Sequence, residues 1–335
     1  MRPTPSGIVA RHRDLGLANP HTPGPPSREL PAEEDPGSRC EPEHNERPVP
    51  ALMTEPRITV YTPESSLASP GVMIRDMFRD LAAGRELAWR LAVRDTSAQY
   101  RQAYLGILWA FIMPLTNTVT WVFLSHAGIV TVGDTALPYP AYVFSGTILW
   151  SILMDALNAP LAQTNGARAM LAKLNFPREA LLLAGIYKVL FNSVIKVTLL
   201  IAALLLFGIN PGFGLLWFPL GILSLILVGT AVGLLITPVG MLYTDVGRVL
   251  SLMTQFLMYL TPVVFPMPKE GWPATLFQIN PLTPLILTAR DWLTGLSPAY
   301  LEYFLVVNGA AIFLLLLAWV AYRLSMPILI ERMSA

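Results

Sequence analysis

Long apolar stretches constrain the fold of this sequence more than any other feature. A helix that spans a membrane needs about 20 mostly apolar residues, and six stretches approach or exceed that length. They lie at about 105–127, 139–161, 180–208, 214–242, 249–266 and 301–323. Backbone polar groups inside a bilayer must bond within the protein, and a helix satisfies them all. The sequence therefore predicts an all-α integral membrane protein with six transmembrane helices.

The composition agrees with this class of protein. Charged residues make up 13% of the chain, against roughly 25% in a soluble domain, and the mean hydropathy is +0.51. A net charge of +1 gives no basis for a nucleic-acid partner. Cys40 is the single cysteine, which excludes a disulfide within the chain.

The first 52 residues differ from the rest of the chain. They are rich in proline and charge and poor in large apolar side chains, so we expect a disordered tail. They contain no apolar core of a signal peptide. Met53 follows at once, so the segment is either a real tail or an over-extended start. We expect a cytoplasmic segment at 53–84 and the membrane domain at 85–335.

The segment between the fifth and sixth apolar stretches is too apolar for a plain loop. Its prolines also interrupt any continuous span. Half-inserted or re-entrant helices fit this pattern, and they require cover from protein or water at membrane depth. We therefore expect re-entrant half helices between spans 5 and 6.

The distribution of lysine and arginine predicts the orientation of the spans. Basic residues in short loops mark the cytoplasmic side. They gather before span 1, between spans 2 and 3, and after spans 4 and 6, while the segments at 128–138 and 209–213 hold none. Both termini are predicted to be cytoplasmic, and the re-entrant hairpin is predicted to face outward.

An amphipathic helix is predicted directly before span 1, along the cytoplasmic interface. One stripe of its helical wheel is charged and polar, and holds Glu86, Arg90, Arg94, Ser97 and Arg101. The nearly opposite stripe holds Trp89, Ala92, Thr96, Tyr100 and Ala103. The basic stripe either anchors the topology or also contacts phosphate groups.

Motifs of soluble enzyme chemistry are missing from the sequence. It contains no G-x-x-x-x-G-K-[ST], H-E-x-x-H, C-x-x-C or G-x-S-x-G. Carboxylates outside the tail are dispersed, and no pair is spaced for acid–base work. We therefore expect no catalytic residue and no metal, and no cofactor bound by this chain. The pattern favours a passive pore or the membrane half of a machine that is powered elsewhere.

A series of short motifs resembles the permease subunits of ABC-2 type exporters for polysaccharides, which move lipid-linked O-antigen or teichoic-acid chains. The first motifs are Arg94-Asp95, Tyr100-Arg101-Gln102, Leu105-Gly106, Trp109-Ala110 and Pro114. The resemblance continues in NFPREALLLA (175–184), VGTAVGLLITPVGMLYTDVGRVL (228–250), YLTPVVFP (259–266) and NPLTPLILTARDWL (280–293). Two positions depart from the family pattern: Thr244 replaces an arginine, and Thr261 replaces a serine.

The resemblance implies a homodimer in the inner (plasma) membrane, coupled to two copies of a separate ATPase subunit that uses the ATP. Its substrate would be a glycan on a polyprenyl diphosphate. Arg90, Arg94, Asp95 and Arg101 would contact the ATPase or the lipid diphosphate. The loop between spans 2 and 3 would be the coupling helix, with Arg168, Met170, Leu171, Lys173, Leu174, Phe176, Pro177, Arg178 and Glu179.

Other residues have two interpretations each. Gly229 and Gly233 form G-x-x-x-G, which suits packing within one subunit or a dimer seam. Aromatic residues of spans 1 and 2 belong to the interfacial belts and core, or line a glycan channel: Trp109, Phe111, Trp121, Phe123, Tyr142, Phe144 and Trp150.

Polar residues within the spans also have two interpretations. Lys188, Asn192 and Lys196 share one helix face. Asp155 is expected at the depth of Lys188, so these residues form a structural ion pair or a polar channel stripe.

Two other functions remain open from the sequence. One is an ABC-2 permease for a drug or a small lipid. The other is a membrane-embedded transferase acting on polyprenyl-linked sugars, which would need loop carboxylates that the sequence does not offer.

Overall fold

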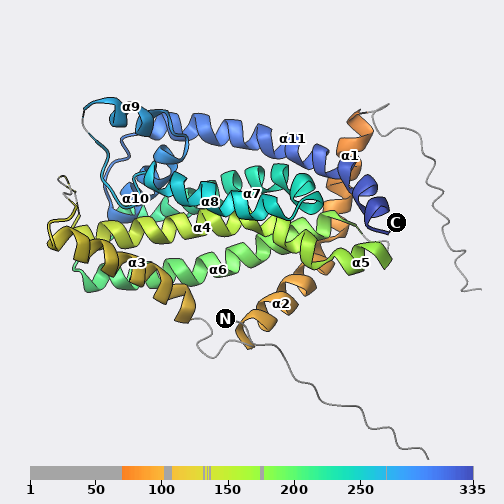
Figure 1. Ribbon diagram of the computed structural model, residues 1–335, viewed down its shortest axis with the longest axis horizontal. Coiled ribbons are helices and arrows are strands. Elements are labelled where there is room, and N and C mark those ends of the chain that lie inside the picture. Colours follow the sequence, from red (N-terminus) through yellow and green to blue (C-terminus); the bar gives the residue numbers. More distant parts are fainter. Residues whose placement is uncertain are drawn as a thin grey trace, which may run out of the picture. The chain divides into compact units, whose positions relative to one another are not determined.

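The computed structural model describes residues 70–101, 108–130, 133, 135, 137–173, 177–268 and 270–334. All of them belong to one compact unit, Pro63–Ala335, and every regular element among them is helical (Figure 1). The all-α prediction is therefore confirmed for this part of the chain. The predicted tail at 1–52 and most of the segment at 53–84 lie outside the described residues.

The elements follow one another along the chain with short connections. In order they are α1 (Pro70–Ala83), α2 (Arg85–Arg101), α3 (Trp109–His126), α4 (Tyr139–Gly166), α5 (Arg168–Lys173), α6 (Glu179–Leu206), the 3-10 helix η2 (Phe213–Leu216), α7 (Phe218–Leu242), α8 (Asp245–Tyr259), α9 (Trp272–Ile279), α10 (Leu282–Thr294) and α11 (Leu301–Ser334).

Four of the described helices are long and apolar enough to cross a membrane. They are α4, α6, α7 and the Leu301–Arg332 part of α11. The predicted stretch at 105–127 contains α3 and the one at 249–266 overlaps α8, and neither helix meets the length and hydropathy needed to cross a membrane. Threonines and Asn117 make α3 less apolar, and α8 has only 15 residues. The predicted count of six spans therefore remains a prediction.

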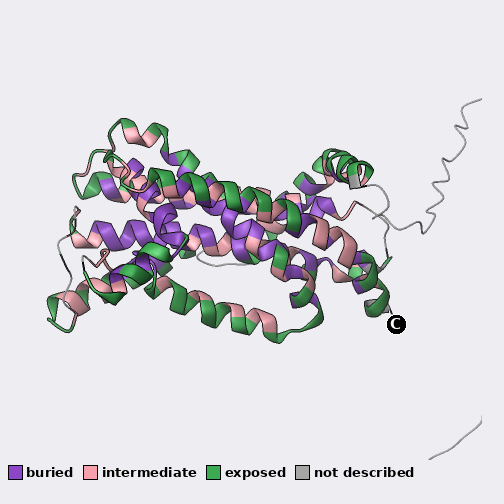
Figure 2. Ribbon diagram, turned by 90° about the horizontal axis from the view of Figure 1, so that it is seen from above, coloured by how far each residue is buried: buried purple, intermediate pink, exposed green. Residues whose placement is uncertain are grey.

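Helices α4 and α7 form the inner pair of the bundle, as their buried surfaces show (Figure 2). Their apolar windows are 78% and 67% buried, against 28% for α6 and α11. The two glycines of G-x-x-x-G permit this close contact. A Cβ on Gly229 would lie 2.7 Å from the Ala156 Cβ, and one on Gly233 would meet the Leu157 carbonyl of α4. The interpretation as packing within one subunit is confirmed.

Helix α8 ends at Tyr259, and among the described residues that follow no regular element occurs until α9 begins at Trp272. This break frees backbone carbonyls, which two polar side chains of the following segment satisfy. The Asn280 amide donates to the Leu260 carbonyl at 2.9 Å. The Arg290 guanidinium donates to the carbonyls of Pro262 and Val263 at 3.0 and 3.1 Å.

Arg290 lies deep in the bundle, with 3% of its surface exposed. Its guanidinium stacks 3.7 Å from the ring centroid of Tyr142, whose hydroxyl donates to the carbonyls of Pro262 and Phe265. It also reaches the Ser145 hydroxyl at 3.3 Å. Arg290 thus joins α10, α4 and the broken chain after α8.

Helices α9 and α10 are short and lie in the segment where re-entrant half helices are predicted; whether they re-enter a membrane stays a prediction. Gly295, with φ 74°, ends α10 in the left-handed conformation that favours glycine. Most of α10 is buried against α7, η2, α4 and α11. The two helices lie at the opposite end of the bundle from α5 and the C-terminal end of α11 (Figure 1).

One arginine connects three helices at the other end of the bundle. Arg323 of α11 donates to Glu179 of α6 at 2.6 Å and to Asp80 of α1 at 2.7 Å. An edge-to-face contact between Phe78 and Trp319, with centroids 5.2 Å apart, lies between the same two helices α1 and α11. A buried apolar cluster, which includes Met77, Leu181 and Tyr322, supports these contacts.

We predict that Gly233→Ala destabilises the protein. The added methyl group meets backbone rather than a movable side chain, and overpacking of this kind costs about 1–3 kcal/mol. The matched control is Gly309→Ala in α11, where a Cβ would meet nothing within 4 Å. The measurement is the temperature at which each detergent-purified variant loses its size-exclusion peak. Equal midpoints for the two variants would contradict the proposed contact.

We also predict that Arg290→Lys lowers the same midpoint. A lysine keeps the charge but cannot donate to carbonyls and a hydroxyl from a planar fork, and each buried acceptor left unpaired costs about 1–3 kcal/mol. Arg248→Lys is the control, because the Arg248 side chain is 83% exposed. A midpoint for Arg290→Lys within error of the control would show that the guanidinium geometry is not required.

Candidate functional site

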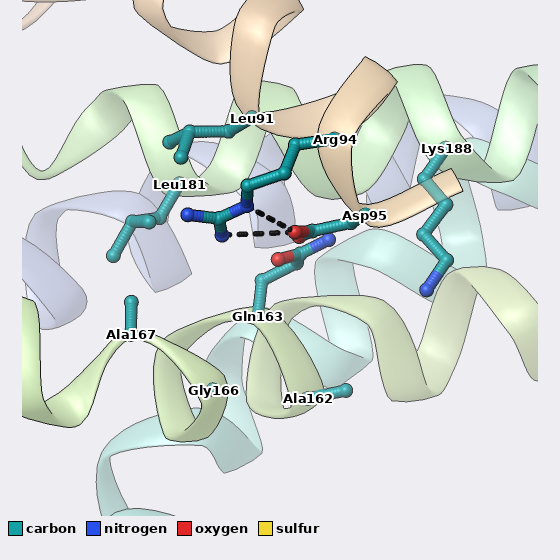
Figure 3. A pocket seen from close by; sticks show the side chains of 9 residues that line it. All are labelled: Leu91, Arg94, Asp95, Ala162, Gln163, Gly166, Ala167, Leu181 and Lys188. Atoms are coloured by element: carbon teal, nitrogen blue, oxygen red, sulfur yellow. Dashed lines mark hydrogen bonds and ion pairs between the residues drawn. The ribbon is translucent and has the colours of Figure 1, made fainter. Parts of the chain in front are cut away.

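A cavity of about 250 Å³ lies where α2, α4 and α6 meet (Figure 3). Four polar side chains line it: Arg94 and Asp95 from α2, Gln163 from α4 and Lys188 from α6. The rest of the wall is apolar or small, formed by Leu91, Ala162, Gly166, Ala167 and Leu181. Arg94, Asp95 and Lys188 are candidates from the sequence, whereas Gln163 gave no signal there.

The cavity carries an excess of positive charge. The Arg94 side chain donates to Asp95 Oδ1 through Nε at 2.9 Å and approaches it through Nη2 at 2.8 Å. The Arg94 side chain is still 63% exposed. Within the described part of the chain, the Lys188 ammonium forms no hydrogen bond or ion pair. Two cations therefore face one carboxylate, an arrangement that suits an anion with several oxygens.

Helix α2 presents its predicted polar stripe to the outside. Glu86, Arg90, Arg94, Ser97 and Arg101 are all exposed, and Arg90 donates to Glu86 at 2.6 Å. The buried side consists of Ala88, Leu91 and Ala92, which face α6.

One residue of the opposite stripe lies at the edge of the contact with α6. Trp89 is 60% exposed, because α2 rests on α6 through its smaller side chains and leaves this ring at the edge of the contact. The ring of Trp89 packs edge-to-face against the ring of Tyr187, with the two ring centroids 6.0 Å apart. Ala103, the last member of the stripe, lies outside the described residues.

The ion pair in the membrane-spanning region differs from the prediction. Asp155 pairs with Lys196, at 2.8 Å, and not with Lys188, which was placed at the same depth. Helix α4 continues past residue 161 to Gly166, so Asp155 lies further from the helix end than the predicted boundary implied. Lys196 is 8% exposed, and the interpretation as a structural ion pair is supported for these two residues.

The third polar residue of the α6 face serves as a contact between helices. Asn192 accepts a hydrogen bond from the Tyr100 hydroxyl at 2.9 Å, which ties the last turn of α2 to α6. Burial raises the pKa of Tyr100, and the charge of Asp155 raises it further. The hydroxyl therefore stays protonated and able to donate.

The aromatic residues of the first two predicted spans divide into two groups. Tyr142, Phe144 and Trp150 are buried in the core of this chain, at 6%, 2% and 7% exposure. These values support the core interpretation for all three. Phe111 packs edge-on against Phe144, and Trp121 against Phe265, while Trp109 is exposed.

The predicted coupling segment contains the short helix α5, which contacts α4 and α11. Leu171 is 5% exposed and belongs to the same buried cluster as Met326 and Leu329, so it packs within this chain. Arg168 donates to the Met241 carbonyl at 2.5 Å, and Glu179 holds Arg323.

Other members of this segment point outward or are not described. Lys173 is exposed and Met170 is half-buried, as are Pro177 and Arg178. Leu174 and Phe176 lie outside the described residues. The face available to a partner is therefore smaller than the predicted list.

Two positioning residues were not recognised in the sequence. Asp80 showed no signal beyond its place in the predicted cytoplasmic segment, and Arg323 looked like a charge that ends the last span. The Asn-Pro motif at Asn280 and the arginine that follows it resembled the family, but nothing in the sequence indicated that both side chains bond the broken chain after α8.

The sequence is similar to that of known transporters. It matches the ABC-2 type transporter family over residues 86–294, which is 209 of 335 residues. It is 24% identical over 217 residues to the O-antigen export system permease protein RfbA of Myxococcus xanthus, covering 64% of this chain and 82% of that protein. It is 22% identical over 234 residues to the protein of the same description from Klebsiella pneumoniae, covering 66% and 88%. Because the family match covers more than half of the sequence, this protein belongs to the ABC-2 type transporter family.

Proposed function

We propose that this protein is the membrane-spanning permease subunit of an exporter that moves a lipid-linked polysaccharide out across the inner membrane. The observation that carries the proposal is the similarity to two O-antigen export permeases, which extends over more than four fifths of each of them. The transporter family and the four long apolar helices agree with it. A separate ATPase subunit supplies the energy, and this chain assembles as a homodimer.

In this proposal α3 and α8 complete a set of six spans. Both have largely exposed apolar surfaces, with Phe123 at 67% and Phe256 at 69%, as expected of helices that face lipid or a second subunit. Both termini then lie in the cytoplasm, where α1, α2 and α5 also lie. The α9–α10 hairpin lies at the outer side, and α4 and Arg290 of α10 cover the broken backbone that precedes it.

The cavity between α2, α4 and α6 is the proposed place for the diphosphate of the substrate. Arg94 offers a guanidinium fork and Lys188 a cation without a partner in the described residues. Arginine forks match phosphate oxygens in a bidentate manner. Gln163 adds an amide, and Asp95 holds Arg94 in place until a phosphate competes for it.

The proposed contact with the ATPase is the outward side of α5 and its neighbours. Arg168, Leu171 and Glu179 hold α5 and the start of α6 onto the rest of the chain. Lys173 and Met170 remain available to a groove in the partner. Inward residues therefore set the position of α5, and outward residues form the contact.

We predict that Lys188→Gln and Arg94→Gln each reduce export of the surface polysaccharide to less than a third. Each change removes one cation from the cavity, and one charge-assisted contact contributes about 1.5–3 kcal/mol. Export is measured as surface glycan in a strain that lacks the chromosomal gene. Arg248→Gln is the control, since this exposed arginine lies outside the cavity. Normal export by both cavity variants, at wild-type protein levels, would place the diphosphate elsewhere.

We predict that Lys173→Glu weakens the association with the ATPase subunit while the permease stays folded. The side chain is exposed, so reversing its charge disturbs a partner rather than the core. Co-purification of the ATPase and the thermal midpoint of the permease are measured together. Arg75→Glu in α1 makes the same charge change at another exposed site. Leu171→Asp is expected to lower the midpoint itself, because Leu171 is buried. Full ATPase retention by Lys173→Glu would contradict this contact.

A further inference from the structure

A second hollow lies along the contact between α2 and α6, and the proposed function does not use it. It has a volume of about 520 Å³ and is lined by Arg85, Glu86, Trp89 and Tyr187. Arg85 and Arg94 are nine residues apart on α2, which turns their side chains about 180° away from each other. This groove therefore lies on the other side of α2 from the cavity with Lys188.

The charges in the groove are arranged for an anion. Glu86 pairs with Arg90 at 2.6 Å, so this exposed pair adds no net charge, and Arg85 leaves the groove with an excess of positive charge. The Arg85 side chain forms no hydrogen bond or ion pair within the described residues, and neither does the Tyr187 hydroxyl. One free guanidinium and one free hydroxyl thus border the same hollow, and both donate well to phosphate oxygens.

The exposed residues along the contact between α2 and α6 change from charged to aromatic to apolar, which is the order of headgroup, boundary and acyl chains in a membrane lipid. Tyr187 and Trp89 stand beside the charged groups, and such rings favour the boundary between headgroups and acyl chains. Further along α6, Phe191 is 47% exposed and Val194 is 65% exposed. Tyr100 packs edge-on against Phe191 at 6.2 Å between centroids. Hydrogen-bond donors for a phosphate, then aromatic rings, then an exposed apolar surface therefore follow one another along this contact.

We propose that this groove binds one anionic glycerophospholipid of the inner leaflet. Its phosphate accepts hydrogen bonds from Arg85 and Tyr187, and its acyl chains run along Phe191 and Val194. A zwitterionic headgroup is less suitable, because its ammonium needs a carboxylate and Glu86 is engaged by Arg90. The lipid holds the interface helix α2 against α6 from the side that faces the bilayer.

The test is native mass spectrometry of the full-length protein with added phosphatidylglycerol or phosphatidylethanolamine of identical acyl chains. We expect the wild type to bind one phosphatidylglycerol more tightly than any phosphatidylethanolamine. Arg85→Gln should weaken that binding about fivefold, the effect of one cationic residue near an anionic surface. Tyr187→Phe should weaken it in the same direction without changing charge or ring packing. Arg248→Gln is the matched control and should bind like the wild type.

Several results would overturn the proposal. Equal binding of the two lipids by the wild type would show that the headgroup charge is not recognised. An equal loss in Arg85→Gln and Arg248→Gln would reveal general attraction rather than a site. Unchanged binding in both Arg85→Gln and Tyr187→Phe would exclude the groove. Displacement of the phospholipid by a polyprenyl diphosphate, with the same dependence on Arg85, would assign the groove to the export substrate instead. Loss of export in the Lys188 variant tests the cavity and is independent of all these results.

Discussion

The bonds that Arg290 makes to the broken chain after α8 allow an apolar bundle to contain a stretch of backbone that is not helical. Carbonyls without partners are costly where water is excluded. The guanidinium and the Asn280 amide replace the missing helical bonds of Leu260, Pro262 and Val263. Helix α10 can therefore turn back against α4 and α7, and this end of the bundle becomes a covered hairpin rather than an open loop.

Helix α4 is the common support for this hairpin and for the other end of the molecule. Tyr142 and Ser145 near its start contact Arg290, Leu153 and Leu157 receive the glycine face of α7, and Asp155 pairs with Lys196 of α6. Gln163 near its end reaches the cavity beside α2. Because one continuous helix makes all four contacts, a displacement of α4 would move both the contacts of Arg290 at one end and the cavity beside α2 at the other.

The sequence allowed the helical class and the exposed stripe of α2 to be predicted, because both depend on the spacing of apolar residues. It also placed Arg94 at a cytoplasmic phosphate site that remains a proposal. Prediction from the sequence failed where a side-chain contact depends on where a helix ends or on which helix packs against it. Asp155 pairs with Lys196 rather than Lys188, a choice that depends on how α4 and α6 are staggered and not on residue counts from the predicted helix ends. Leu171 is buried because α11 packs against α5. The residues around Leu171 in the sequence give no sign of this contact.

The single arginine shared by α1, α6 and α11 has a consequence for the order in which the chain matures. Arg323 follows its partner Asp80 by 243 residues and Glu179 by 144. At roughly 5–20 residues per second, the ribosome needs between about 12 and 50 s after Asp80 to deliver that arginine. During this interval Asp80, and later Glu179, lack the shared cation, so the ion pairs of Arg323 can form only once α11 has been made. The contact between α1 and α11 is therefore among the last to form, and a product truncated before α11 would lack it, although α1 also contacts α2 and α6.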